Sequence, residues 1–240
     1  MIRNKTRWKR AQKAEAEFWF SEIKSPRYTD PTGEERRAGV AGELRHFGFD
    51  VQVAIRSAER ILEVGSGPVG LIHFVETPAL RIGIDSLMRA LESSGYTNRY
   101  GVSRIEAMGE AIPLASESIN ILICFNVLDH CADPWQVLSD VHRILRPGGT
   151  LLLQLYTIAP YARPLAPLLS LVDPPHPFRF THWQLVQFVT EAGLLMKHHH
   201  EFVPAHWELD LTRPLAKDTI RHFISNLIRR LSYITAVKRS

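Results

Sequence analysis

The sequence predicts an α/β fold: a doubly wound, mainly parallel seven-stranded sheet with helical extensions at both ends. Two observations support this prediction. Short apolar runs alternate with helix-like segments from residue 60 onward, and the first of these runs ends in a Gly-x-Gly turn. The chain has 240 residues and is 45% hydrophobic, which is enough for one substantial core. We therefore expect a helical cap at residues 1–48, one domain at 49–212, and a basic amphipathic helix at 213–240.

The cap is predicted to contain two helices. Residues 8–24 lack proline and glycine and are rich in alanine and aromatic residues, which favours a helix. A turn-rich loop at 25–33 then leads to a second helix at 34–45. We expect these helices to cover a ligand pocket, with the aromatic side chains of Trp8, Phe18 and Trp19 packed into the core.

The first strand, at residues 61–64, runs into glycines that bring the backbone close to a ligand. Gly65, Gly67 and Gly70 fit the pattern G-x-G-x-x-G, which is typical of nucleotide-type cofactor sites. Asp85, at the end of the second strand (residues 81–85), is placed to accept hydrogen bonds from ribose hydroxyls. This pair of features alone is compatible with a dinucleotide or with another adenosine-containing cofactor.

Three further strands are predicted at residues 102–106, 119–125 and 150–156. Polar residues follow the fourth strand at 126–134, where the carboxyl ends of parallel strands form a binding edge. Asp133 is a suitable helix N-cap, with Pro134 at the first helical position. That helix is predicted to end at residues 146–149, before a fifth strand whose continuous apolarity indicates burial on both faces.

Residues 157–180, after the fifth strand, are rich in proline. They are predicted to form a lid over the binding edge or, alternatively, a stiff surface connection. Thr181 and Gln184 form a capping-box pattern for a helix that ends near Gly193. Two last strands are expected at 194–203 and 207–211. The apolar side chains of the final helix then recur at helical spacing, which leaves docking on the domain, a partner interface or a membrane surface open.

Composition narrows the function classes. The net charge of +4 is concentrated at the two ends, which we interpret as solvated surface, so no nucleic-acid partner is expected. No apolar run is long enough to span a bilayer, and the charged start does not resemble a secretion signal, so a cytoplasmic protein is expected. Cys124 and Cys131 are expected as free thiols. Residues 198–200 are three consecutive histidines in a predicted strand. Because side chains alternate between the two faces of a strand, the middle imidazole points away from the other two, and no metal site is expected.

Four motifs in order carry a family resemblance: LEVGSGPVG at 62–70, IGID at 82–85, AIPL at 111–114, and NVLDHCADP through LRPGG at 126–149. This set resembles the class I S-adenosylmethionine (SAM) dependent methyltransferases of the small-molecule, methyltransferase-11-like branch, which have a Rossmann-like fold. A nicotinamide dehydrogenase shares only the first two motifs. The resemblance implies SAM as cofactor and a small-molecule acceptor, with O-methylation of a sugar, lipid-linked or phenolic/quinone-type metabolite expected. The alternative is a non-catalytic SAM-binding scaffold or regulatory protein.

The resemblance also implies which residues hold SAM. They are Glu63, Gly65, Ser66 and Gly67 for the amino acid end, Asp85 and Ser86 at the ribose, Leu87, Met108, Gly109 and Glu110 at the adenine, and Asn126 and Val127 along the methionine. Two positions depart from the family pattern: Met108 and Asn120 each stand where an aspartate is common. We therefore expect the adenine to be held by the backbone at Met108 and Gly109 and by stacking, with Glu106 or Glu110 as substitute acceptors.

No nucleophile is needed for this chemistry, because SAM carries an activated methyl group. A hydroxyl acceptor must nevertheless lose a proton, and a positioned histidine can act as general base. His130, just after the fourth strand, is the first candidate, with Asp129 to orient it. His176 in the predicted lid is the second candidate, and Cys131 is expected to be only a small wall residue.

Overall fold

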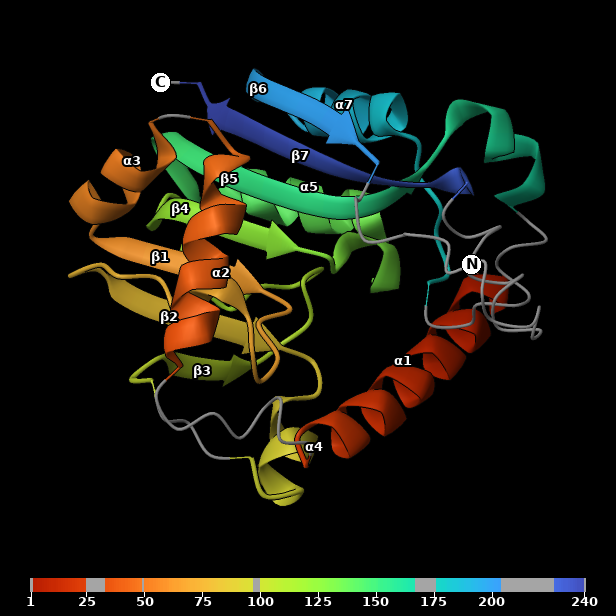
Figure 1. Ribbon diagram of the computed structural model, residues 1–240, viewed down its shortest axis with the longest axis horizontal. Helices are drawn as coiled ribbons and strands as arrows, with labels where there is room; N and C mark the ends of the chain where they lie inside the picture. Colours follow the sequence, from red (N-terminus) through yellow and green to blue (C-terminus); the bar gives the residue numbers. More distant parts are fainter. Residues whose placement is uncertain are drawn as a thin grey trace, which may run out of the picture.

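A seven-stranded sheet in the order β3-β2-β1-β4-β5-β7-β6 runs through the centre of the computed structural model (Figure 1). The structure describes residues 2–24, 33–48, 50–96, 100–166, 176–203 and 227–239, with side chains from residue 8 onward. The strands are β1 (Arg60–Val64), β2 (Leu80–Asp85), β3 (Ser103–Glu106), β4 (Ile119–Phe125), β5 (Leu145–Ile158), β6 (Leu194–Phe202) and β7 (Arg229–Lys238).

The first five strands are parallel to one another, and β7 runs antiparallel between β5 and β6. This arrangement confirms the predicted doubly wound, mainly parallel sheet. All five carboxyl ends therefore meet at one edge, where the loops after β1, β2 and β4 converge.

Helices cover both faces of the sheet (Figure 1). The α-helices are α1 (Ile2–Glu22), α2 (Glu34–Arg45), α3 (Val51–Ser57), α4 (Met88–Ser93), α5 (Pro134–Ile144) and α7 (His182–Glu191). Short 3-10 helices are η2 (Leu71–His73), η3 (Leu128–His130) and η4 (Pro160–Leu165). None of these described helices is both long and apolar enough to cross a membrane.

The core consists of two layers, one on each face of the sheet. Leu62 and Leu122 point to the layer that contains residues of α5 and α7, whereas Ile61 and Ile123 point to the layer that contains residues of α2 and α3. Successive strand residues thus bury opposite faces, which is why these strands are apolar at every position.

Two helices begin at the capping residues that the sequence predicted. The side chain of Asp133 accepts hydrogen bonds from the backbone N–H of Trp135 at 3.1 Å and of Gln136 at 3.2 Å, which caps α5. Thr181 and Gln184 form the reciprocal capping box at the start of α7. Each cap forms between residues two or three positions apart, so it depends on the local sequence and not on tertiary contacts.

The predicted C-terminal helix is wrong for residues 229–238, which form β7. Leu231 and Tyr233 pack into one layer, and Ile234 and Ala236 into the other. Pairing with two strands and burial on both faces outweigh the helical spacing of the apolar residues. Residues 213–226 of that helix, and the strand expected at 207–211, lie outside the described residues.

Other boundaries also differ from the predictions. Strand β5 begins at Leu145, so the turn at Gly148 lies inside it, and it continues to Ile158. The predicted lid therefore begins only with η4, and residues 167–175 of it lie outside the described part. Helix α3, which the sequence did not suggest, packs Val51 and Ile55 into the core.

Candidate functional site

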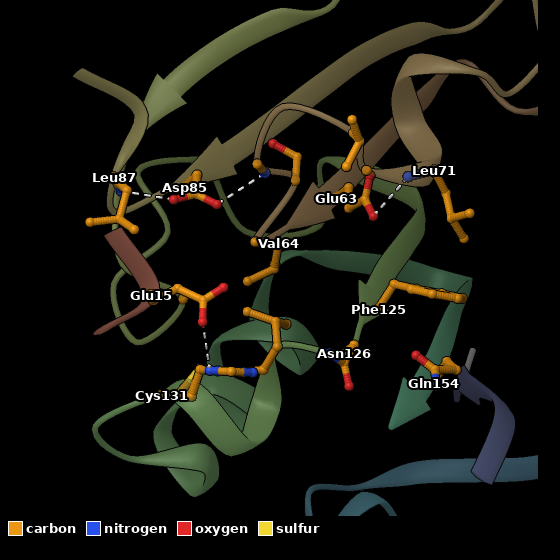
Figure 2. Close-up of a pocket in the computed structure, with 18 of the residues that line it drawn as sticks. Glu15, Glu63, Val64, Leu71, Asp85, Leu87, Phe125, Asn126, Cys131 and Gln154 are labelled. Carbon is orange, nitrogen blue, oxygen red and sulfur yellow. Dashed lines mark hydrogen bonds and ion pairs between the residues drawn. The ribbon is translucent and has the colours of Figure 1, made fainter. Parts of the chain in front are cut away.

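A cavity of about 520 Å³ lies at the carboxyl edge of the sheet (Figure 2). This volume is within the usual range of small-molecule sites. Every cofactor-binding residue that the resemblance implied lines the cavity, namely Glu63, Gly65, Ser66, Gly67, Asp85, Ser86, Leu87, Met108, Gly109, Glu110, Asn126 and Val127. Their binding role stays a prediction, but the fold brings them together at one site.

The glycine turn after β1 is pressed against the segment that follows β4. Gly65 has a φ of 69°, in the left-handed region that favours glycine. A Cβ added there would lie 2.2 Å from Cγ2 of Val127. The backbone N–H groups of Gly65 and Ser66 both donate to the carbonyl of Ile84, at 2.8 and 3.1 Å. The turn is therefore fixed between β2 and residue 127, with its backbone facing the cavity.

Glu63 lies beneath the turn and supports it. Its side chain is 1% exposed, and its two oxygens accept from the backbone N–H of Leu71 at 3.1 Å and of Ile72 at 2.8 Å. Burial raises the pKa of this carboxyl to about 8, although the two amide donors oppose the shift. Glu63 thus positions the loop that follows the glycine turn and also lines the cavity.

Asp85 is held rigidly at the rim. Its Oδ2 accepts from the N–H of Gly67 at 3.0 Å, and its Oδ1 accepts from the N–H of Leu87 at 2.7 Å. Burial raises its pKa, and the two backbone donors lower it. Because a carboxylate oxygen can accept more than one hydrogen bond, both oxygens keep capacity for ligand hydroxyls.

The residues expected at the adenine separate into two groups. Glu110 lines the cavity, and its Oε1 accepts from the N–H of Ala132 at 2.6 Å and of Asp133 at 3.0 Å. Glu106 is not among the lining residues; it pairs with exposed Arg89 at 3.2 Å. Of the two expected substitutes, only Glu110 is therefore placed to meet a ligand.

Asn120 lies far from this chemistry. Its Oδ1 accepts from the N–H of Arg60 at 3.0 Å, where β4 and β1 both begin. The amino ends of parallel strands are opposite the binding edge. The departure at Asn120 therefore affects strand pairing and leaves the cavity unchanged.

Helix α1 covers one side of the cavity, as the sequence predicted for the N-terminal cap. Its lining side chains are Trp8, Gln12, Glu15 and Trp19. Ser86 donates to Gln12 at 2.9 Å, and the indole of Trp19 donates to Glu15 at 2.8 Å. The expected core packing is wrong for Phe18, which is 51% exposed because it lies on the outer side of α1.

The wall near β4, β5 and β7 contains several polar groups, of which the family resemblance implied only Asn126 as a site residue. Asn126, with a left-handed φ of 52°, and Gln154 each carry a buried side-chain oxygen without a hydrogen-bond partner among the described residues. Tyr233 donates to Glu43, and both line the cavity. Figure 2 shows Asn126 and Gln154 away from Asp85 and Leu87. The one available signal was Gln154, a polar residue inside an apolar strand.

The structure brings the three expected catalytic residues together. The Nε2 of His130 lies 3.7 Å from Oδ1 of Asp129, and the Nε2 of His176 lies 4.0 Å from Oδ2 of Asp129. The two imidazole rings have centroids 4.5 Å apart. Of the three residues, only His130 lines the cavity. We call these residues the His-Asp cluster.

Cys131 lines the cavity as a small wall residue. Its Sγ donates to the carbonyl of Val127 at 3.3 Å, and burial raises the thiol pKa well above its usual value. Such a thiol is a poor nucleophile. Residues 198–200 alternate in direction on β6 as expected, with the Nε2 of His198 lying 3.1 Å from Nδ1 of His200.

Comparisons with known proteins point to one family. The profile of a methyltransferase domain matches residues 62–153. An uncharacterized methyltransferase from Mycobacterium ulcerans is 29% identical over 138 residues, which cover 55% of this chain and 54% of that protein. The chain thus spans about half the length of the curated relatives it matches.

Solved structures show the same fold. A proposed methyltransferase from Bacillus halodurans has a TM-score of 0.60 at 16% identity, covering 86% of this chain and all of that one. Phosphoethanolamine N-methyltransferase 2 from Haemonchus contortus, solved with SAM, has a TM-score of 0.57 at 16% identity, covering 92% of this chain and 60% of that one.

Proposed function

Because residues 62–153 form a methyltransferase domain of the class I SAM-dependent family, we propose that the chain transfers a methyl group from SAM to a small-molecule acceptor. The observation that carries the proposal is Asp85. A half-buried carboxylate between the glycine turn and Leu87, lining the cavity, is suited to the two hydroxyls of a ribose. SAM would then extend from Met108 and Gly109 at the adenine to the turn at Gly65 at the amino acid end.

The charge of the cavity supports a cationic cofactor. Its lining contains five carboxylates and one guanidinium, Arg36, so acidic groups predominate even with Glu63 protonated. A low-dielectric wall of this sign favours the sulfonium and ammonium groups of SAM. The carboxylates are Glu15, Glu43, Glu63, Asp85 and Glu110.

We further propose that the acceptor is polar and is methylated at oxygen. The buried carboxamide oxygens of Gln154 and of Asn126, which the resemblance assigned to the methionine, have no partner among the described residues. Both can accept hydrogen bonds from an acceptor's hydroxyl groups. His130 lines the same cavity and, with the other members of the His-Asp cluster, is suited to assist loss of the acceptor proton. A sugar, a lipid-linked metabolite or a phenolic or quinone-type metabolite fits this description.

Two measurements on the purified chain test the proposal. We expect calorimetry to show binding of SAM and of S-adenosylhomocysteine, and methyl-labelled SAM to label a small molecule in an extract of the organism that encodes the protein. Failure of both SAM and S-adenosylhomocysteine to bind at millimolar concentration would refute SAM as the cofactor. Binding without any labelled product would instead favour the non-catalytic SAM-binding scaffold.

Replacing His130 by alanine should separate catalysis from cofactor binding. With the labelled acceptor identified above, we expect turnover to fall by roughly 10²-fold or more, because help with the acceptor proton is lost. SAM affinity should change by less than about threefold, since the backbone and Asp85 carry that binding.

The matched control for this variant is His142→Ala, which removes a histidine of α5 that does not line the cavity. Unchanged turnover is expected for this control. Normal turnover in His130→Ala would show that the His-Asp cluster does not take part in the reaction.

A further inference from the structure

The His-Asp cluster contains donor atoms that all lie within 4.8 Å of one another. We propose that it binds one divalent first-row transition-metal ion such as Zn²⁺, with the carboxylate of Asp129 and the imidazoles of His130 and His176 as ligands. This proposal departs from the expectation of no metal site, which rested on the histidines at 198–200. It joins residues that are 46 positions apart in the sequence.

The distances within the cluster fit an ion better than direct hydrogen bonds. The gaps of 3.7 Å from Asp129 to His130 and of 4.0 Å from Asp129 to His176 exceed hydrogen-bond length. Two ligands on a tetrahedral ion with bonds of about 2.0 to 2.2 Å are roughly 3.4 Å apart. The two gaps run to different oxygens of Asp129, and the three ligand atoms lie within 4.8 Å of one another, so the widest pair contracts by up to roughly 1.4 Å when an ion binds.

The burial of Asp129 is an independent reason to place a cation here. The residue is 1% exposed, and its Oδ1 has no hydrogen-bond partner among the described residues. A buried carboxylate is costly unless a positive charge or hydrogen-bond donors compensate it. A divalent ion supplies that charge at the atom that lacks a partner.

Glu15 lies beside Nδ1 of His130 at an ion-pair distance, without a hydrogen bond between the two side chains. Its Oε2 lies 3.5 Å from Nδ1 of His130, and the dashed line from Glu15 in Figure 2 marks this ion pair. Trp19 holds the other oxygen of Glu15 at 2.8 Å. Metal-bound histidines usually donate their second ring N–H to such a carboxylate. Nε2 of His130 is therefore the nitrogen left to face the ion.

The ligand types select the class of ion. Imidazole together with a carboxylate suits zinc, cobalt, iron and manganese, whereas magnesium and calcium prefer oxygen ligands alone. Three protein ligands leave a fourth position open, as in catalytic zinc sites. His130 belongs to both the cluster and the cavity wall, which places the ion beside the region assigned to the acceptor.

A role for the ion in catalysis rests on the proposed function, but ion binding itself does not. The ion would lower the pKa of an acceptor hydroxyl bound to it, so that the proton leaves to solvent water. The acceptor oxygen then forms the new bond to the methyl carbon. The electron pair of the broken S–C bond stays on sulfur, which gives S-adenosylhomocysteine. In this arrangement His130 acts as a ligand, and the ion assumes the task expected of a histidine base.

The test uses the full chain after treatment with a chelator. We expect Co²⁺ to bind with one ion per chain and to develop visible absorption typical of a nitrogen and oxygen site, and Zn²⁺ to displace it. Asp129→Asn and His176→Gln should each weaken Co²⁺ binding by at least roughly tenfold. His198→Ala is the matched control, because it removes a histidine from the His198–His200 pair on β6 and should leave the absorption and the affinity unchanged.

Several results would overturn the metal site. One is wild-type Co²⁺ affinity in both Asp129→Asn and His176→Gln, and another is loss of binding in His198→Ala. A third result is absence of any rise in the melting temperature of the wild-type chain with added Zn²⁺, which requires no variant to fold. SAM binding measured on the same metal-free protein keeps the two proposals separate, because it can fail while Co²⁺ binding persists.

Discussion

Asp85→Asn is expected to weaken SAM binding by roughly 10²-fold. The carboxylate can accept charge-assisted hydrogen bonds from two ribose hydroxyls, and each such bond contributes about 1.5 kcal/mol or more. The amide retains one acceptor oxygen but presents an NH₂ group to the N–H of Gly67 or Leu87 and loses the negative charge. Titration calorimetry with SAM and with S-adenosylhomocysteine measures the change.

Glu106→Gln provides the matched control for this prediction. Glu106 is the residue that pairs with Asp85 in the register between β3 and β2, but it does not line the cavity. Its loss of charge should leave SAM affinity within about twofold, since its partner is the exposed Arg89. Equal losses in the two variants would show that Asp85 acts through general charge and not through contact with the ribose.

Gly65→Ala is expected to destabilise the chain by about 2 to 5 kcal/mol and to abolish SAM binding. A left-handed φ costs a residue with a Cβ about 1 to 2 kcal/mol. The added carbon would also lie 2.2 Å from Val127, and relieving such an overlap costs about 1 to 3 kcal/mol. The turn and residue 127 must then separate, which moves the backbone that faces the cofactor. Urea unfolding and SAM calorimetry measure the two effects.

Gly148→Ala measures how much of the lost stability comes from the left-handed backbone conformation alone. Gly148 also has a left-handed φ, of 75°, but nothing lies within 4 Å of a Cβ added there. We expect only about 1 to 2 kcal/mol of destabilisation and normal SAM binding. If Gly65→Ala were no more destabilising than Gly148→Ala, the close packing against Val127 would contribute nothing to the turn.

A double variant tests the same contact from the other side. Truncating Val127 to alanine in Gly65→Ala removes the methyl groups that the new Cβ would meet, so part of the lost stability should return. Measured against Val127→Ala alone, no recovery in urea unfolding would show that the two methyl groups contribute nothing. Backbone strain and the 2.8 Å approach to Cβ of residue 127 would then be the remaining causes.

Local sequence patterns were sufficient to predict the part of the cavity that we propose for the cofactor. The turn at Gly65 depends on backbone conformations that only glycine adopts readily, and Asp85 follows a strand whose apolar pattern is visible in the sequence. The caps at Asp133 and Thr181 are likewise local. Such features depend on residues within a few positions of one another, so their sequence pattern is sufficient to predict them.

The part of the cavity that we propose for the acceptor, and the last strand, depend on contacts between segments far apart in the sequence. The apolar spacing of residues 227–231 is compatible with a helix, but pairing such as Leu152 with Thr235 makes a strand, and no local pattern encodes a partner more than 80 residues away. Glu43, Gln154 and Tyr233 meet at the cavity for the same reason. The motifs also placed Asp129 and His130 together, but the fold had to bring Glu15 and His176 to them, because side chains from distant segments meet only when the two core layers form around the sheet.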